Sequence, residues 1–349
     1  MRAALAIAVA LLAATPAAAS ETIARSALTG GPVLAGGSVL WADAPSGRPR
    51  VLSGGAGRSP VVLRSWPRAT TKDTGRTVAA LAGSPTSTVA VVETCTFRLD
   101  GDAGFVSCAE RAFGGAAGTF APFGWPLPRR SRTGCPGPRT AVSVAAGTGL
   151  TAVAYTPACQ GIALAAARRS RIVVHRGSAR QTIASAGASH LRIAGHYLAY
   201  LEGRRLSQRT AVVLYDLRSR QQVRRYEMPK GTAYLEALDV QANGTLAFVR
   251  SESDGRACVA VLRRRAERER DLACHVDVPY DVAIAAGRVL FLQVTPRGTR
   301  LVLRSPGGRR VLDRIPRTRS FGGFDLAPDR AVWAVGAPGG VQRIVLRQL

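Results

Sequence analysis

Short apolar runs separated by turn residues alternate along most of this chain. The clearest example spans residues 238–249, where two apolar runs flank the dipeptide Asn243-Gly244. Asn-Gly between apolar runs is the strongest short-range signal for a β-hairpin, because both residues tolerate the positive φ angles of a tight turn. The stretch therefore predicts two antiparallel strands, and turn geometry is a sufficient reason for Asn243.

The same paired runs occur seven times along the chain. When the copies are aligned on the last apolar residue before the first turn, they are separated by 47, 63, 49, 47, 44 and 42 residues. A period of about 40–50 residues is typical of a propeller blade with four strands. The aligned residues are Leu34, Leu81, Val144, Ile193, Val240, Ile284 and Leu326.

An aromatic residue recurs at one point of the second strand in six of the seven copies, and Val92 takes its place in the remaining copy. A large apolar ring at this point predicts an inter-blade wedge, which we define as a side chain buried between neighbouring blades. We prefer this structural role to ligand stacking. The six aromatic residues are Trp41, Tyr155, Tyr200, Phe248, Phe291 and Trp333.

Two further strand-like runs follow each hairpin, most clearly at residues 210–217 and 223–226, and helical periodicity is almost absent. The last copy is short: only 23 residues follow Leu326, enough for a second and a third strand but not a fourth. We expect residues 21–26 to supply the missing outer strand and to close the ring. The sequence thus predicts an all-β protein, a single β-propeller over residues 20–349. Seven blades of four antiparallel strands fit best, with six or eight as alternatives.

The repeats resemble those of the TolB-like, or PD40-type WD40-like, β-propellers. Their hairpin typically reads Phe-Ser-Pro-Asp-Gly followed by an apolar strand, and residues 324–335 and 238–249 come nearest to it. The other copies lack Pro-Asp-Gly. TolB also has an α/β domain before its propeller, for which we expect no room here, so its partner interactions are not carried over.

The first 19 residues have the pattern of a cleaved secretory signal peptide. Arg2 precedes an apolar stretch that ends at Pro16, and three alanines then lead to Ser20, the expected first mature residue. An uncleaved anchor helix is the alternative. No later run is long and apolar enough to predict a transmembrane helix. We therefore expect a secreted or other extracytoplasmic protein, and a monomer.

Six cysteines in an exported protein indicate disulfide bonds rather than free thiols. Cys258 and Cys274 are placed as on two facing strands of a hairpin, and Cys95 and Cys108 flank a turn signal. Cys135–Cys159 is then the remaining pair. The chain has no Cys-x-x-Cys and only four histidines, so the sequence does not indicate a metal site.

The formal net charge is +26, and only two of the 48 basic residues are lysines. One interpretation is a surface for anionic polymers, lipids or nucleic acid. The other is a general compositional bias toward arginine and alanine, which we favour because no single run concentrates the charge. The expected export makes nucleic acid the least favoured of these partners.

The longest spacing between copies indicates an insertion at residues 121–139, rich in proline, glycine and arginine. Long loops on a rigid scaffold often bind partners, and aromatic rings beside guanidinium groups could hold an anionic or aromatic ligand. A loop packed on the edge of the propeller and held by Cys135 is the alternative. The candidate binding residues are Phe123, Trp125, Arg129, Arg130 and Arg132. A second charged segment, residues 262–271, has the mixed signs of a solvated hairpin tip.

No catalytic motif is present, and the sequence indicates no cofactor. Propeller enzymes often carry acidic and histidine residues around the central channel, where this chain offers a mixed set, Asp239, Asp281, Asp325 and His190. We therefore predict an exported, non-enzymatic binding or scaffold module for a protein or a cell-envelope polymer. The alternatives are a hydrolase or lyase with its site in the channel, and an arginine-driven polyanion binder.

Overall fold

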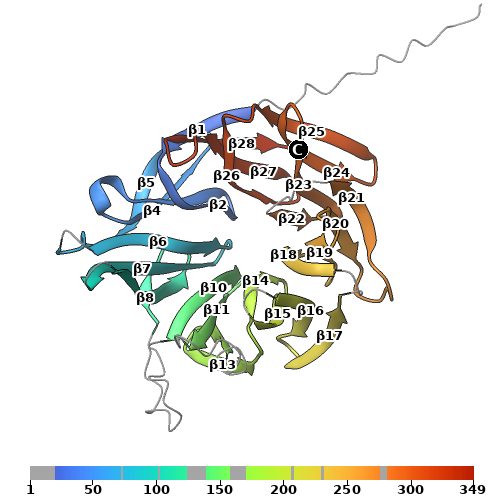
Figure 1. Ribbon diagram of the computed structural model, residues 1–349, viewed down its shortest axis with the longest axis horizontal. Coiled ribbons are helices and arrows are strands. Elements are labelled where there is room, and N and C mark those ends of the chain that lie inside the picture. Colours follow the sequence, from blue (N-terminus) through green and yellow to red (C-terminus); the bar gives the residue numbers. More distant parts are fainter. Residues whose placement is uncertain are drawn as a thin grey trace, which may run out of the picture.

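A computed structural model shows seven four-stranded antiparallel sheets arranged as blades around a central channel (Figure 1). It describes residues 20–349 except 72–73, 101–102, 124–138, 158–169, 206–207, 229–231 and 276–280. The prediction of an all-β propeller with seven blades is confirmed. Every aligned residue of the sequence repeat lies in the innermost strand of its blade.

The first four blades follow the chain, each from its innermost to its outermost strand. Blade 1 contains β2 (Leu28–Ala35), β3 (Ser38–Asp43), β4 (Arg50–Gly55) and β5 (Arg58–Ser65), with a 3-10 turn η1 (Pro45–Gly47) between β3 and β4. Blade 2 contains β6 (Thr74–Gly83), β7 (Ser87–Asp100), β8 (Ala103–Ala116) and β9 (Ala121–Pro122). Blade 3 contains β10 (Arg139–Gly147), β11 (Leu150–Pro157), β12 (Arg171–Arg176) and β13 (Ala179–Ala184). Blade 4 contains β14 (Ser189–Ala194), β15 (Tyr197–Arg205), β16 (Gln208–Asp216) and β17 (Gln221–Glu227).

The last three blades include one that joins the two ends of the described chain. Blade 5 contains β18 (Thr232–Val240), β19 (Leu246–Glu252), β20 (Ala257–Leu262) and β21 (Arg270–His275). Blade 6 contains β22 (Val282–Ala285), β23 (Arg288–Thr295), β24 (Gly298–Ser305) and β25 (Gly308–Ile315). Blade 7 contains β26 (Ser320–Leu326), β27 (Arg330–Gly336), β28 (Gln342–Gln348) and, as its outermost strand, β1 (Ser20–Ser26).

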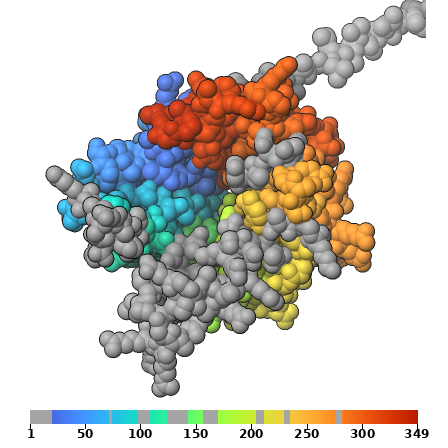
Figure 2. Space-filling model, in the orientation of Figure 1, coloured from blue at the N-terminus to red at the C-terminus, as the bar shows by residue number. Residues whose placement is uncertain are grey.

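The pairing of β1 with β28 brings the N-terminal strand beside the C-terminal one, as the blue and red segments of Figure 2 show. Ile23 of β1 is buried in the same apolar cluster as Trp41 of blade 1 and Val332 of blade 7. Hydrogen bonds therefore hold β1 in the last blade, and apolar contacts join that blade to the first.

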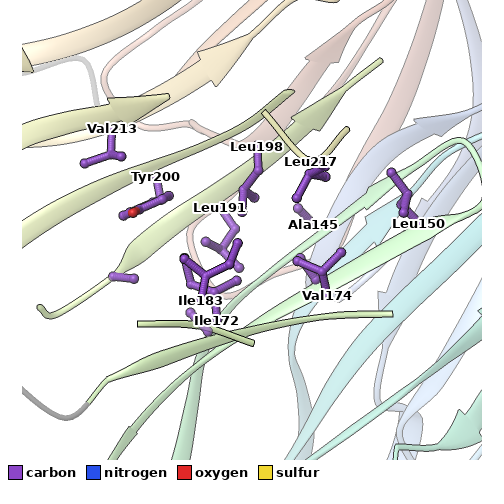
Figure 3. Close-up of a cluster of buried hydrophobic side chains, with 13 residues drawn as sticks. Ala145, Leu150, Ile172, Val174, Ile183, Leu191, Leu198, Tyr200, Val213 and Leu217 are labelled. Atoms are coloured by element: carbon purple, nitrogen blue, oxygen red, sulfur yellow. The ribbon is translucent and has the colours of Figure 1, made fainter. Parts of the chain in front are cut away.

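Each interface between blades has its own apolar cluster, and the recurring aromatic residue lies in it. Tyr200 of blade 4, for example, belongs to the same buried cluster as Ile172 and Ala154 of blade 3, and Figure 3 shows Tyr200 and Ile172 within it. The same relation, an aromatic or Val92 packed against the preceding blade, holds at all seven interfaces. All seven residues are buried, so the predicted wedge has a structural basis at every interface.

The innermost hairpin of blade 5 differs from a two-residue turn. Five residues, 241–245, separate β18 from β19, and the Asn243 side-chain oxygen accepts a hydrogen bond from the Thr245 amide at 2.9 Å. Gly244 has a φ of 79°, which favours glycine. Asn-Gly thus marks the hairpin correctly, but Asn243 acts through its side chain rather than through a positive φ.

The two faces of the disc carry different connections. The turns between the first and second strands contact each other from blade to blade. The Arg288 guanidinium donates a hydrogen bond to the Pro328 carbonyl, and the Gly149 amide donates one to the Thr86 hydroxyl. In an antiparallel blade, the turn between the third and fourth strands lies at the same end. We call this side the turn face, and the opposite side, which carries the connections between blades, the connection face.

The predicted insertion at 121–139 has narrower limits than its sequence suggests. Ala121–Pro122 form β9, and Arg139 begins β10, so the connection on the connection face covers residues 123–138. The rest of the extra length lies in β7 and β8, which are 14 residues each. A disulfide between Cys95 and Cys108 joins these two long strands.

Candidate functional site

The central channel contains a cavity of about 570 Å³ that residues from the innermost strands of all seven blades line. Its wall consists mostly of alanine, valine and other small apolar side chains. The charged residues of the wall are Arg192, Asp239, Asp325, Asp329 and Arg330. Asp281 and His190 lie two positions further from the turn face and are not part of the wall of this cavity.

Two of the channel carboxylates bridge neighbouring blades. Asp239 of β18 accepts a hydrogen bond from the Ile284 amide of β22 at 2.7 Å. Asp325 of β26 accepts one from the Leu34 amide of β2 at 2.8 Å, with its second oxygen on the Leu326 amide. Both acids precede the aligned residue of their own repeat and bind the amide of the aligned residue in the next. Their position therefore gives them a structural role at the blade interfaces.

Arg192 of β14 brings the acidic groups of two further blades together. Its guanidinium lies 3.7 Å from Asp239 and 3.9 Å from Asp281, measured between nitrogen and carboxylate oxygen. Asp281 in turn accepts a hydrogen bond from the Val282 amide. The arginine thus offsets part of the negative charge that three blades direct toward the channel.

Burial raises the pKa values of these carboxyl groups. The pKa of Asp239 rises to about 7 and that of Asp281 to about 6, because burial penalises the charged form more than Arg192 and the amide hydrogen bonds favour it. The negative charge of Asp325 adds to both increases, and the pKa of Asp325 is itself raised by burial. Asp239 and Asp281 thus share one arginine, and all three carboxylates also accept hydrogen bonds from backbone amides.

The remaining predicted channel residue, His190, is part of β14 and has a left-handed backbone with a φ of 52°. It does not share an ion pair with Arg192. Of the four channel residues singled out from the sequence, Asp239 and Asp281 therefore lie beside Arg192.

Phe123, the first of the predicted binding residues, is packed against the protein. Its ring stacks on His175 with centroids 4.3 Å apart and an interplanar angle of 13°. A Cβ at Gly114 would lie only 2.5 Å from this ring, so glycine permits the approach. Burial and the charge of Arg180 lower the pKa of His175. Trp125, Arg129, Arg130 and Arg132 lie outside the described residues.

Two of the predicted disulfides are present, Cys95–Cys108 and Cys258–Cys274, and both join facing residues of adjacent strands. Cys135 and Cys159 lie outside the described residues. Within the described part, the only groupings of potential metal ligands are these two disulfides with Glu93 or Asp271. Disulfide sulfur lacks the thiolate form that binds metals, so these groupings do not fit a metal ion.

Solved structures share the architecture of this chain at low sequence identity. The WD40 domain of Toxoplasma gondii coronin aligns over 95% of this chain and 86% of its own, with 11% identity and a TM-score of 0.52. A chain of the mitotic checkpoint complex aligns over 100% and 97%, with 12% identity and a TM-score of 0.51. The fold is that of WD40 propellers.

A prolyl endopeptidase structure is also similar, with 11% identity and a TM-score of 0.55, but this chain spans only 50% of it. At these identities the likenesses show the fold alone. No protein-family model and no curated protein matches the sequence. Over the described residues, no helix has the length and apolar character needed to cross a bilayer.

Proposed function

We propose that this chain is an exported, non-enzymatic propeller of the TolB-like type that binds a protein or an anionic polymer of the cell envelope. The observation that carries the proposal is that the channel carboxylates bind the protein's own backbone. Asp239, Asp281 and Asp325 each accept backbone amides, and Asp239 and Asp325 thereby connect blades. With these groups engaged in holding the ring, the outer surface and its loops are the place to seek binding.

Two features support export, the pattern of the N-terminal sequence and the disulfide bonds. Residues 1–19 have the pattern of a signal peptide. Disulfides at Cys95–Cys108 and Cys258–Cys274 are typical of oxidising compartments outside the cytoplasm. A binding role is in keeping with the similar chain in the mitotic checkpoint complex, which is a component of a protein assembly. A monomer is the simplest state for a propeller whose first and last strands pair within one chain.

Affinity capture from a cell-envelope fraction tests the proposed binding and, at the same time, the role of residues 123–138, which connect β9 to β10. We expect the wild-type protein to retain a defined envelope component, and the variant W125A/R129A/R130A/R132A tests whether residues 125–132 take part in holding it. The control R297A/R317A/R319A also removes three exposed arginines from turns of the connection face and should bind normally. If the wild-type protein retains nothing, the proposal fails; if the connection variant binds as well as wild type, the site lies elsewhere.

A hydrolase or lyase with its site in the channel is the second candidate, favoured by the two carboxylates, Asp239 and Asp281, that lie 3.7 and 3.9 Å from Arg192 beside a cavity. Turnover of chromogenic esters and glycosides, measured for wild type and for Asp239→Asn and Asp281→Asn, tests it. Activity that both variants abolish would support the enzyme. We expect no turnover above the background of the assay.

A further inference from the structure

The outer turns of blades 3, 4 and 5 are connected to one another on the turn face. Gln181 of β13 donates a hydrogen bond at 3.1 Å to the Tyr215 hydroxyl of β16. That hydroxyl donates to the Arg220 carbonyl at 2.6 Å, in the turn between β16 and β17. Arg224 of β17 then reaches the turn between β20 and β21. Three turns that are far apart in the sequence therefore form one surface.

The last of these turns, residues 263–269, is held in place by contacts with blade 4. The Arg224 guanidinium donates to the carbonyls of Arg263 and Arg264 at 3.3 and 3.0 Å, and to that of Glu267 at 3.4 Å. The Arg264 guanidinium lies over the Tyr197 ring and bonds to its hydroxyl. Side chains on a turn fixed in this way lose less conformational entropy when they bind a ligand.

Two further contacts fix the same turn. The Tyr226 hydroxyl bonds to the Glu269 carboxylate, and the Cys258–Cys274 disulfide joins the strands on either side. Most of the tip is exposed, as its mixed charges predicted, but Glu269 and Arg264 contact blade 4, which leaves mainly cationic groups outside.

Six exposed arginines project from these three turns, and we call them the arginine rim. None of their guanidinium groups has a hydrogen-bond or ion-pair partner among the residues that the structure describes. Glu267 is the one exposed acidic residue in segments 177–180, 217–221 and 263–268. The rim consists of Arg180, Arg218, Arg220, Arg263, Arg265 and Arg268.

We propose that the arginine rim binds an anionic polysaccharide, a polymer with carboxylate or phosphate groups on repeating units. This inference rests on the proposed function and specifies its ligand class and site. Guanidinium groups bind carboxylate and phosphate in a bidentate manner and remain charged at any physiological pH. Several of them on one preorganised surface can bind successive groups of one polymer, and release of the polymer's counterions adds to the affinity.

The composition of the rim favours a polysaccharide over other anionic macromolecules. Single-stranded nucleic acid is usually held by stacking on exposed aromatic rings, and protein partners by aromatic or large apolar anchors. The three described segments of the rim expose neither: their one large apolar residue, Leu217, is buried. Charge alone is what this surface offers.

Binding of fluorescently labelled alginate and phosphorylated dextran to the mature protein, measured across a salt series, tests the proposal. We expect wild type to bind at least one of the two polymers, depending on whether the rim prefers carboxylate or phosphate, and not to bind neutral dextran. R263A/R265A/R268A should bind about tenfold or more weakly and with a shallower salt dependence, because three cationic contacts are lost. R297A/R317A/R319A, which removes equal charge from the connection face, should bind as wild type. Equal melting temperatures establish that all three proteins are folded.

Several results would overturn the inference. Wild type that binds neither polymer, or two variants that weaken binding equally, would remove the rim as the site. Tighter rim-dependent binding of duplex DNA than of either polysaccharide would replace the ligand class. Failure of the wider proposal is separable: if wild type captures an envelope component and the rim variant captures it equally, only the rim fails.

Discussion

Asp239 has two kinds of partner in the channel, and they act on its charge in opposite directions. The Ile284 amide and Arg192 favour the carboxylate, whereas burial favours the neutral acid and raises the pKa to about 7. Because the second effect is larger, ionisation of this residue costs the folded protein free energy at neutral pH. A role in holding the blades is compatible with this cost, since either protonation state leaves an oxygen to accept the amide hydrogen.

We therefore expect the free energy of unfolding to fall as the pH rises from 5 to 8. A carboxyl with a folded pKa above its unfolded value binds a proton more strongly when folded, so it stabilises the fold at low pH and loses this effect as the pH passes the folded pKa. For Asp239 the loss is at most about 4 kcal/mol, given 1.36 kcal/mol for each pKa unit. Asp239→Asn, which keeps the acceptor but cannot ionise, should show a flatter profile in urea denaturation.

Asp254→Asn is the matched control for this measurement. Asp254 is exposed, and a hydrogen bond from the Arg256 amide lowers its pKa, so it stays ionised over the whole range. The variant should keep the pH dependence of wild type, and comparison between variants cancels the contribution of His175. A flat wild-type profile, or the same slope in wild type and Asp239→Asn, would contradict the assignment.

For single residues of the channel, the sequence showed which positions carry charged side chains but did not show which groups those side chains contact. The acids before the aligned residues could be named from the repeat, but nothing local shows that Asp239 and Asp325 bind the next blade rather than a ligand. Arg192 was visible as the one basic residue at that position. Its pairing with Asp239 needs the ring geometry, which places adjacent repeats side by side.

At the scale of strands and blades, the recurring aromatic residue is what fits one sheet against the next. Phe248 of β19 is fully buried among Leu201, Val212 and Leu214 of blade 4. A ring of this size can fill the space that opens between twisted sheets, and its removal leaves a cavity that the rigid neighbours cannot fill.

Phe248→Ala should lower the free energy of unfolding by about 3–5 kcal/mol, the usual cost of truncating a buried aromatic residue. Phe97→Ala removes the same side chain from a site that is 45% exposed, and we expect a change within about 0.5 kcal/mol. Chemical denaturation of both variants gives the comparison. Equal losses at the two positions would show that burial between blades is not what makes Phe248 important.

Elements were predictable where the signal was local and repeated. Hairpins, aromatic positions and the two disulfides between facing strands follow from spacing and turn residues. The extra length of β7 and β8 could not be predicted in this way, because strands and extended loops of similar composition differ only in their long-range pairing. For the same reason the sequence did not show that the turn at 263–269 is fixed, since Arg224, which holds it, is some 40 residues away.

At the scale of the whole molecule, pairing of β1 with β28 makes the first and last described strands part of one blade. Ile23 is only 8% exposed and packs with Trp41 and Ile344. A ring connected in this way has a protected edge on its last blade, so contacts of a short N-terminal strand affect the stability of the complete propeller.

Ile23→Ala should therefore lower the free energy of unfolding by about 2–3 kcal/mol, as for other buried isoleucines. Thr22→Ala changes the adjacent, exposed residue of the same strand and should leave stability within about 0.5 kcal/mol of wild type. Thermal unfolding of the two variants would contradict the role of β1 if the melting temperature of Ile23→Ala matched that of Thr22→Ala.

We propose that the channel residues hold the propeller together and that binding takes place on the outer surface. Binding of the envelope component captured by wild type, compared between D239N/D281N and R263A/R265A/R268A, tests this most directly. We expect the channel variant to bind as wild type at pH 7, and the rim variant to lose about tenfold or more in affinity. Loss of binding in the channel variant, with the rim variant unaffected and both proteins folded, would contradict it.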